Sequence, residues 1–436
     1  MANAAVICVG NELLNGNTVD TNSNWLAGRL LTASIPVIYT CTVPDVVSDI
    51  KNAIENASAK ADIILITGGL GPTDDDLTRD GIAQFLSVKL EYHPEIEEKI
   101  KKFFAVRNYP MAEKNKIQAY LPAGTSEIEN DLGTAPGIFY PVRDKESEIP
   151  DGHQRWPVSN GVNEGNKKII VAMPGVPSEM KQMFDKSILP RIEKFAGGDF
   201  IVVRKVRCIG AGESAIAEML GDLMSRDRNP LINCTVDCGI ITLHIVARAK
   251  DKSKAAALAA QDIQRLCGIL GKLVYGLDEQ SLAQVVGQKL LDMKKTLAVA
   301  ESCTGGLIAK MITDVPGSSG YFLNGWVTYS NESKTSELGV KKELIEKAGA
   351  VSSEVAAAMA EGARKKSGAD FAISITGIAG PQGGSEQKPV GLVYISIALP
   401  KGVETEKYLF GLRDRGFIRQ RAAQTALNLL RLKLGI

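Results

Sequence analysis

The residue with the most specific chemical potential is a serine that joins a strand-like segment to a helix-like one. In VAESCTGGLIAKMI, Ser302 follows an apolar run and precedes Thr304, Gly305 and Gly306. A serine in this position can be exposed as a nucleophile, while backbone amides at the helix start face a developing oxyanion or a bound phosphate. Because the last histidine of the chain is His244, a Ser-His-Asp triad is excluded here. The base must then be a lysine, a tyrosine or a carboxylate; the alternative is that Ser302 only caps the helix.

Candidates for the base and for substrate contacts lie in two later segments. In GWVTYSNESKTSELGV, Tyr329 and Lys334 are five positions apart and can share a pocket if a strand turns into a helix between them. A lysine beside a tyrosine can stay neutral or can lower the pKa of the phenol, and either change provides a base for a serine. Cys303 is a rival nucleophile, but its place at the start of the predicted helix favours burial. The segment SITGIAGPQGG offers groups suited to holding a phosphate or a carboxamide: Thr376, Gly377, Ala379 and Gly380.

A second constellation, TGGLGPTDDDLTRD, follows an apolar segment nearer the start of the chain. Its glycines, Gly68, Gly69 and Gly71, can bring backbone N–H groups onto a phosphate, since glycine accepts positive φ and has no Cβ. Carboxylates beside phosphates, here Asp74 to Asp76, commonly hold a hard divalent cation. The alternative is a glycine turn followed by an Asp-rich helix start, where Asp is favoured anyway.

Alternating strand-like and helix-like segments position this second constellation. From residue 4 their order predicts a parallel sheet covered by helices, with ligands at the carboxyl ends of the strands. IILIT and KKIIVAM are apolar without a gap, as in strands that are covered on both faces. Two other polar turns reach the same edge, one carrying Glu12, Asn15 and Asn22 and one running from Met173 to Glu179. Three turns therefore converge on one crevice.

Two further units follow along the chain. Residues 198–277 have the β-α-β-β-α order of a small α+β module, and residues 278–436 alternate helices and strands, with adjacent late strands that indicate a mixed sheet. The predicted fold class is α/β: two layered α/β/α domains, residues 1–197 and 278–436, joined by the α+β module. Residues 143–168 are polar and rich in Gly and Pro, which predicts a mobile surface excursion whose His153 and Trp156 are loop residues rather than ligand contacts.

Length and composition agree with several globular domains. The chain has 436 residues, and its 51 Lys+Arg against 50 Asp+Glu give no general attraction to nucleic acid or to an anionic membrane. Seven scattered cysteines predict reduced, buried thiols. Cys234 and Cys238 are spaced C-x3-C, but three histidines and no second cysteine pair argue against structural zinc. The start lacks a basic signal region and no long apolar run exists, so we expect a cytoplasmic protein without membrane association.

The N-terminal motifs resemble a known domain. GNELLNG, TGGLGPTDDDLTRD, LGTAPGIFY and MPGVPSEMK are similar, in order and spacing, to the molybdopterin-binding-like domain of the CinA family of competence/damage-inducible proteins. The resemblance implies metal-dependent cleavage of ADP-ribose to AMP and ribose 5-phosphate. The excursion at 143–168 is longer than the turn expected there. The resemblance assigns phosphate binding to the residues at the matching positions, Gly68, Gly69, Gly71, Thr73 and Lys114. It assigns a divalent metal (Mg or Co) to Glu12, Asp75 and Asp76, and it implies K as a further candidate cation.

The C-terminal motifs resemble another domain of the same family. AESCTGGLIA, GWVTYSNESKTSELGV, VSSEVAAAMAEGAR and SITGIAGPQGG are closely similar to the PncC-type nicotinamide mononucleotide deamidase. The resemblance implies hydrolysis of nicotinamide mononucleotide to nicotinate mononucleotide and ammonia, without a cofactor. At the positions that match the family motifs, the resemblance implies that Ser302 is the nucleophile and that Tyr329 and Lys334 activate it. The substrate-binding residues that it implies are Gly305, Gly306, Thr376, Gly377, Arg415 and Arg419.

The middle unit resembles the KH-like module of this family. Its turn Gly210-Ala211-Gly212-Glu213 lacks the basic flanks of an RNA-clamping loop, so we expect a connecting or dimerising role. The whole chain is predicted to be a bifunctional hydrolase of pyridine nucleotide recycling that acts on small nucleotides, forms a homodimer and has no nucleic acid partner. The alternative is a non-catalytic nucleotide- or pterin-binding protein linked to competence or to molybdenum cofactor synthesis.

Overall fold

The computed structural model describes residues 2–141, 168–195 and 198–436. The chain divides into two compact units, Met1–Val202 with Arg248–Ala256, and Val203–Ala247 with Ala257–Ile436. The predicted excursion at 143–168, with His153 and Trp156, lies outside the described residues apart from Lys168.

The first unit is built on a six-stranded sheet with the order β2-β1-β3-β8-β7-β6. Strands β2, β1, β3 and β8 are parallel, as predicted, and the antiparallel strands β7 and β6 extend the sheet at one edge. The connection between β6 and β7 is too short for a crossover helix, which explains their antiparallel pairing. The strands are β1 (Ala4–Val9), β2 (Val37–Val43), β3 (Ile63–Thr67), β6 (Ser126–Ile128), β7 (Gly137–Pro141) and β8 (Ile169–Met173).

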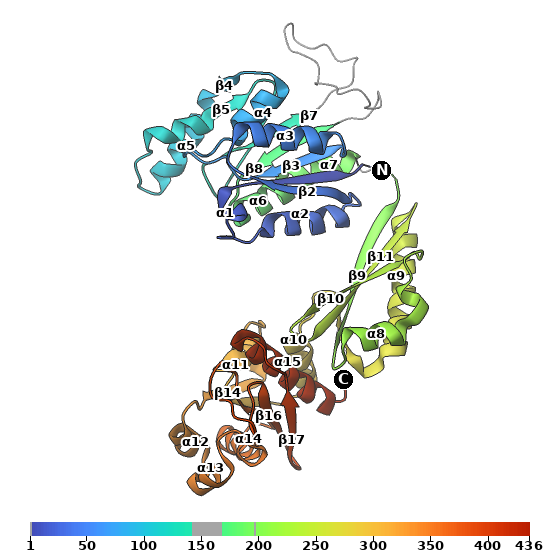
Figure 1. Cartoon of the computed structure of the whole chain (residues 1–436), viewed down its shortest axis with the longest axis vertical. Helices are drawn as coiled ribbons and strands as arrows, with labels where there is room; N and C mark the ends of the chain where they lie inside the picture. Colours follow the sequence, from blue (N-terminus) through green and yellow to red (C-terminus); the bar gives the residue numbers. More distant parts are fainter. Residues whose placement is uncertain (1, 142–167, 196–197) are drawn as a thin grey trace. The chain divides into compact units, whose positions relative to one another are not determined.

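Helices cover both faces of this sheet (Figure 1). Because side chains alternate between the faces of a strand, Ile7 packs into one core and Val6 into the other, and every residue of β1 is buried. Two-sided burial accounts for apolar runs without a gap. One face carries α3 (Val47–Ser58) and α4 (Thr78–Leu86), and the other α2 (Thr21–Thr32), α6 (Pro177–Met183) and α7 (Leu189–Ile192); α1 (Asn11–Leu14), β4 (Leu90–Tyr92), α5 (Pro94–Val106), the 3-10 helix Glu113–Ala119 and β5 (Tyr120–Pro122) complete the unit.

The KH-like module forms a four-stranded sheet with the order β10-β11-β9-β12. Its elements follow the predicted β-α-β-β-α order and add one short strand at the end. That strand, β12, pairs antiparallel with β9 and leads directly into the next domain. The elements are β9 (Phe200–Ile209), α8 (Glu213–Leu220), β10 (Leu231–Asp237), β11 (Ile240–Ala249), α9 (Lys252–Leu270) and β12 (Val274–Leu277).

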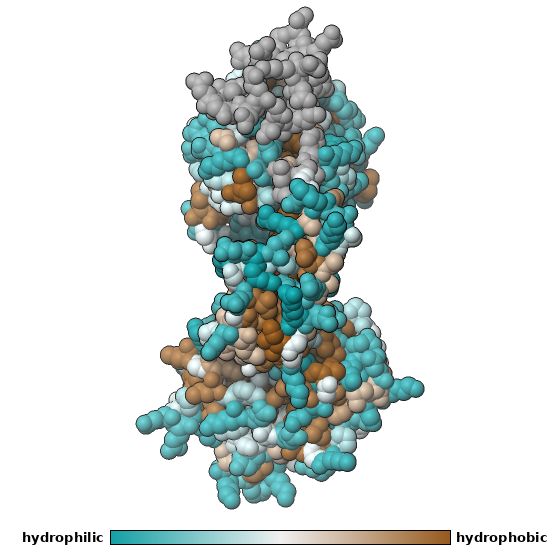
Figure 2. Space-filling model, turned by 90° about the vertical axis from the view of Figure 1, so that its right-hand side faces the viewer, coloured by the Kyte–Doolittle hydropathy of each residue, from teal (hydrophilic) through white to brown (hydrophobic). Residues whose placement is uncertain are grey.

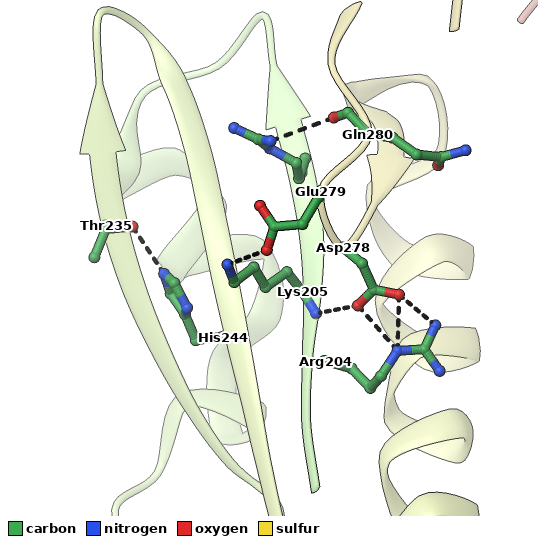
Figure 3. A network of polar contacts seen from close by, with 8 residues as sticks. Arg204, Lys205, Thr235, His244, Asp278, Glu279 and Gln280 are labelled. Carbon is green, nitrogen blue, oxygen red and sulfur yellow. Dashed lines mark hydrogen bonds and ion pairs between the residues drawn. The ribbon is translucent and has the colours of Figure 1, made fainter. Parts of the chain in front are cut away.

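The segment that follows β12 is bound to strand β9 by charged groups (Figure 3). The Arg204 Nε atom donates to both carboxylate oxygens of Asp278 at 2.9 Å, and the backbone amide of Lys205 donates to the same carboxylate at 3.0 Å. The Lys205 ammonium pairs with Glu279 at 2.5 Å. These bonds fix the path of the chain where the C-terminal domain begins.

The C-terminal domain contains a mixed five-stranded sheet with the order β14-β13-β15-β16-β17. Strand β13 is parallel to both neighbours, while β15, β16 and β17 are antiparallel to one another, which confirms the predicted mixed sheet. Helices cover both faces, so Val299 packs into one core and Ala298 into the other. The elements are α10 (Leu282–Asp292), β13 (Leu297–Glu301), α11 (Leu307–Thr313), β14 (Phe322–Val327), α12 (Asn331–Leu338), α13 (Lys342–Ala348), α14 (Ser353–Ser367), β15 (Phe371–Gly377), β16 (Leu392–Leu399), β17 (Gly402–Leu409) and α15 (Arg415–Lys433).

A buried arginine joins the end of α15 to the KH-like module. Arg431 is 1% exposed, and its guanidinium donates to Asn428 Oδ1 at 2.9 Å and to the carbonyls of Lys272, Val274 and Ile436 at 2.5, 3.2 and 2.8 Å. Removing it leaves several buried acceptors without a donor, and each such group costs about 1–3 kcal/mol.

Replacing Arg431 with methionine should therefore lower the free energy of unfolding by roughly 3 kcal/mol. Urea unfolding followed by circular dichroism measures the change. The control is Arg413→Met at an exposed position, which should leave stability within about 0.5 kcal/mol of wild type. Equal stability of both variants would contradict the assigned role of Arg431.

None of the described helices combines the length and the apolar composition needed to cross a membrane. On the face shown in Figure 2, hydrophilic side chains cover most of the surface and apolar side chains gather in separate patches.

Candidate functional site

Ser302 lies in a tight turn after β13, with 9% of its surface exposed. Its backbone amide donates to the carbonyl of Ile375 in the neighbouring strand β15 at 3.0 Å. Gly305 and Gly306 adopt φ of 60° and 91°, so α11 begins only at Leu307. The expected helix start at Cys303 is therefore wrong by four residues, because two successive left-handed residues cannot belong to an α-helix.

Lys334 lies next to the serine. Its Nζ donates to Ser302 Oγ at 3.1 Å and to the carbonyl of Thr328 at 2.8 Å, and the lysine is 1% exposed. The chain leaves β14 and enters α12 within a few residues, which brings the lysine back over the end of β13. Burial lowers the pKa of Lys334, since desolvation penalises the ammonium form. The structure thus pairs a serine with a lysine that loses its proton more readily than usual.

Tyr329 occupies a different position from the one expected of an activator. It is 61% exposed, and its hydroxyl accepts a hydrogen bond from Arg415 Nη2 at 2.8 Å. Within the described part of the chain, no hydrogen bond joins that hydroxyl to Ser302 or Lys334. Arg415 also donates to the carbonyl of Gly380 at 2.9 Å. Tyr329 and Arg415 therefore form a separate polar pair at the rim of the site.

Two other predicted substrate contacts hold the backbone around the site. Arg419 donates through Nε and Nη2 to the carbonyl of Thr304, at 3.2 and 2.7 Å, and so fixes the turn that carries Ser302. Thr376 is 1% exposed, and its hydroxyl donates to the carbonyl of Ala350 at 2.8 Å. At Gly377 a Cβ would lie 2.8 Å from the carbonyl oxygen of Leu392, so the position requires glycine for packing.

The sequence did not reveal the role of Glu301. This fully buried carboxylate accepts the backbone amides of Ile308 and Ala309 at 3.1 and 2.9 Å, and so occupies the N-terminus of α11. The first amides of α11 are thus already bonded, and the predicted donors around Thr304 to Gly306 do not belong to the helix. Oxyanion donors have to come from the turn before the helix. An acidic residue just before a glycine turn and a helix is the only signal that hinted at this cap.

Cys303 is a poor nucleophile despite its position next to Ser302. It is 6% exposed, and burial raises the pKa of its thiol to about 12. Only the thiolate attacks, so the geometry favours the serine.

The first unit contains a cavity of about 410 Å³ at the carboxyl ends of its parallel strands. Of the predicted residues, it gathers Glu12, the three glycines, Asp75 and Asp76, but not Thr73 or Lys114. Lys114 instead pairs with Asp74 at 3.0 Å on the exposed surface. Glu179, from the predicted third turn, also lines it. The sequence missed two polar lining residues: Asp45, which precedes α3, and Gln118 of the 3-10 helix.

Packing at Gly68 and hydrogen bonds from Arg79 fix the backbone of the glycine turn in this cavity. Gly68 adopts a φ of 104°, and a Cβ there would lie 2.1 Å from the carbonyl oxygen of Val9. Arg79 is 1% exposed and donates to the carbonyls of Leu70 and Gly71 at 2.7 and 2.9 Å. The backbone amide of Gly68 donates to the carbonyl of Met173 at 3.0 Å, so the amides that the turn can offer to a ligand are those that follow Gly68.

Thr73 and Asp76 close the same turn. One Asp76 carboxylate oxygen, Oδ2, accepts the backbone amide and the hydroxyl of Thr73 at 2.8 and 2.5 Å. A bound phosphate would thus meet a Thr73 whose donors are already engaged. Thr73 and Asp76 have a clear role in shaping the turn.

The charge of the cavity decides which ligands it can take. Its described lining holds five carboxylates and no lysine or arginine side chain, the acidic residues being Glu12, Asp45, Asp75, Asp76 and Glu179. A phosphate that entered this cavity without a cation would be repelled by the carboxylates. Among the described residues, no group of three His, Cys, Asp or Glu side chains is arranged to hold a metal ion. Carboxylates suit Mg²⁺, which is often bound by one or two of them together with substrate phosphates. The donor set therefore fits a hard cation that completes its shell with substrate.

Three family models match successive parts of the chain. The model described as Probable molybdopterin binding domain matches residues 5–194, Damage-inducible protein CinA KH domain matches 203–276, and CinA C-terminal domain matches 279–434.

Relatives match over nearly the whole chain. A CinA-like protein of Gloeothece citriformis is 42% identical over 434 residues, which cover 99% of both chains. A Caldicellulosiruptor saccharolyticus protein described as competence-damage inducible is 41% identical over 428 residues, covering 98% of both. Among solved structures, the competence/damage inducible protein CihA of Agrobacterium tumefaciens is 42% identical, covering 36% of this chain and 94% of its own, with a TM-score of 0.35. The chain belongs to the CinA family of competence/damage-inducible proteins.

Proposed function

We propose that the C-terminal domain hydrolyses the carboxamide of nicotinamide mononucleotide, with Ser302 as nucleophile and Lys334 as its base. The observation that carries this proposal is the 3.1 Å hydrogen bond between Lys334 Nζ and Ser302 Oγ, made by a lysine whose burial lowers its pKa. A base of this kind must reach the proton that it removes and must be neutral when it does so. Both conditions favour Lys334 over Tyr329, whose hydroxyl is bonded to Arg415.

The reaction divides into two steps. Neutral Lys334 takes the hydroxyl proton while Ser302 Oγ bonds to the carboxamide carbon, and the tetrahedral intermediate collapses as Lys334 returns the proton to the departing nitrogen. Ammonia leaves, and an ester joins the nicotinoyl group to Ser302. Water, deprotonated by the same lysine, then attacks the ester and releases the carboxylate product and free serine. Glu301 already binds the first amides of α11, and the Gly305 amide donates to the carbonyl of Ser302 at 3.1 Å. The candidate oxyanion donors are therefore the amides of Cys303, Thr304 and Gly306.

The phosphate of this substrate is assigned to the arginines at the start of α15. A guanidinium has five N–H donors, and the described hydrogen bonds of Arg415 use two of them. The remaining donors suit a phosphate at the rim of the site. Arg419 is hydrogen-bonded to the carbonyl of Thr304, so it holds the turn that carries Ser302 in position and adds positive charge near the phosphate.

Ammonia release from nicotinamide mononucleotide, measured with EDTA present, tests this function directly. We expect turnover that does not depend on a divalent metal. Absence of turnover together with measurable nucleotide binding would instead support a non-catalytic nucleotide- or pterin-binding role.

A second activity is favoured by the acidic, glycine-lined cavity of the first unit. We infer that it cleaves the pyrophosphate of ADP-ribose with water, giving AMP and ribose 5-phosphate. The amides of Gly69 and Gly71 would bind phosphoryl oxygens. One or two of the carboxylates of Glu12, Asp75 and Asp76 would hold the divalent cation together with the substrate. A cation bound there would offset the charge of the phosphates and act as a Lewis acid. The five carboxylates of the lining explain why metal dependence is expected.

Asp75→Asn should reduce metal-dependent ADP-ribose cleavage by about 10²-fold and leave deamidation unchanged, because Asp75 lines only the cavity of the first unit. The control is Asp74→Asn, since Asp74 is exposed, pairs with Lys114 and does not line the cavity. The release of AMP, followed by chromatography, measures the effect. Equal losses in the two variants, or loss of both activities in Asp75→Asn, would contradict the assignment.

A further inference from the structure

A second cavity of about 260 Å³ adjoins the acidic cavity of the first unit. Thr134 lines both, so the two spaces are separated by a single stretch of chain. The residues that line the second cavity come from α5 and from positions 127–136.

The stretch between the cavities is fixed by Asn130. Its side-chain amide donates to the carbonyl of Ala135 at 2.9 Å and to Glu179 Oε2 at 2.7 Å, and its oxygen accepts the amides of Leu132 and Gly133 at 3.1 and 2.9 Å. Because Glu179 belongs to the wall of the first cavity, this residue ties the two walls together. A ligand that spans both spaces would meet a preformed ridge rather than a flexible loop.

The second cavity differs in chemistry from the first. Its apolar wall consists of Ile96, Ile100, Phe103 and Pro136, and Ile96 and Ile100 are 2% and 3% exposed. The polar side contains the carboxylates of Glu127 and Glu129, both bonded to Lys99 Nζ at 2.8 Å, and that of Asp131. A carboxylate accepts about four hydrogen bonds, so acceptor capacity remains after these pairs form. Apolar walls with acceptors suit a heteroaromatic base with amino or ribose hydroxyl donors.

We propose that this second cavity binds the adenosine end of ADP-ribose while the pyrophosphate occupies the first cavity. The inference rests on the pyrophosphatase activity proposed above and assigns an orientation to its substrate. Of the two ends of ADP-ribose, only adenosine has an aromatic plane to place against Ile100 and Phe103. The terminal ribose consists of hydroxyl groups and gains nothing from an apolar wall.

Phe103→Ala tests the assignment, with Tyr109→Ala as the matched control because Tyr109 is 69% exposed and does not line the cavity. Titration calorimetry with Mg²⁺ present compares AMP with ribose 5-phosphate as probes. We expect Phe103→Ala to weaken AMP binding about ten-fold, because the base loses its contact with an aromatic ring, and to leave ribose 5-phosphate binding unchanged. Glu129→Gln, which keeps the size of the side chain, should weaken AMP binding in the same selective way.

The outcomes separate this inference from the activity on which it rests. If wild type cleaves ADP-ribose but Phe103→Ala and Glu129→Gln bind AMP as tightly as wild type does, the orientation is wrong and the activity stands. Equal weakening of AMP and ribose 5-phosphate would also overturn the orientation. If wild type neither binds nor cleaves ADP-ribose, the proposed activity fails and the orientation fails with it.

Discussion

Ser302→Ala is expected to lower ammonia release from nicotinamide mononucleotide by at least about 10⁴-fold. Ser302 Oγ is the only protein atom that bonds to the substrate carbon in the proposed mechanism, so no neighbouring group replaces it. Ser302 is 9% exposed, and alanine fits the same turn, so the fold should be preserved. A coupled ammonia assay measures the loss, and circular dichroism verifies folding.

Two further variants make the serine test specific. Ser319→Ala removes an exposed hydroxyl and should leave the rate unchanged. Cys303→Ala should retain most of the activity, because the buried thiol is not ionised near neutral pH. ADP-ribose cleavage should be equal in all three variants. Activity that survives in Ser302→Ala and disappears in Cys303→Ala would move the nucleophile to the thiol.

Lys334→Met should reduce deamidation by about 10³-fold, since methionine fills a similar volume but accepts no proton. In wild type the reaction needs the neutral amine, so the rate should rise with pH and level off above the folded-state pKa. Burial places that pKa below its usual value of 10.5. The pH profile of kcat/KM measures this rise in rate, which should be absent in Lys334→Met. The control is Lys310→Met, at an exposed position of α11. An unchanged profile in Lys334→Met would exclude the lysine as the base.

The same lowered pKa affects stability. Between the folded-state pKa of Lys334 and 10.5, the unfolded chain binds a proton that the folded chain has lost. The free energy of unfolding therefore rises with pH through this window. Wild type should gain stability relative to Lys334→Met as pH increases there, which urea titrations at several pH values would detect.

The sequence predicted the C-terminal site through local signals. The apolar run before Ser302 marked a buried strand, and the short spacing from Tyr329 to Lys334 allowed both side chains to return to the strand end. Which of the two contacts the serine depends on how α12 starts, and local pattern does not specify that. Glu301 was missed because its role depends on the path of the turn at Gly305 and Gly306, where two positive φ angles delay the helix.

In the first unit, the sequence predicted only part of the site. Its glycine turn and the turn that ends at Glu179 were recognisable, but Asp45 and Gln118 reach the cavity from segments that no local pattern connects to it. Thr73 looked like a phosphate ligand, whereas the folded turn engages its amide and its hydroxyl with Asp76. The parallel strands were predicted from the alternation of strand-like and helix-like segments, and their burial on both faces from uninterrupted apolar runs. The antiparallel edge strands β6 and β7 were not, because strand direction at an edge depends on the length of the connection.

The burial of Cys303 also bears on chemical durability. Enzymes that attack with a thiolate are inactivated when that sulfur is oxidised or alkylated, because the reactive form is also the vulnerable one. Here the nucleophile proposed is a hydroxyl, and the adjacent sulfur is enclosed and protonated, with a pKa of about 12. If the proposed deamidase activity is present, it should persist under peroxide or iodoacetamide, conditions that would inactivate a cysteine hydrolase of the same fold.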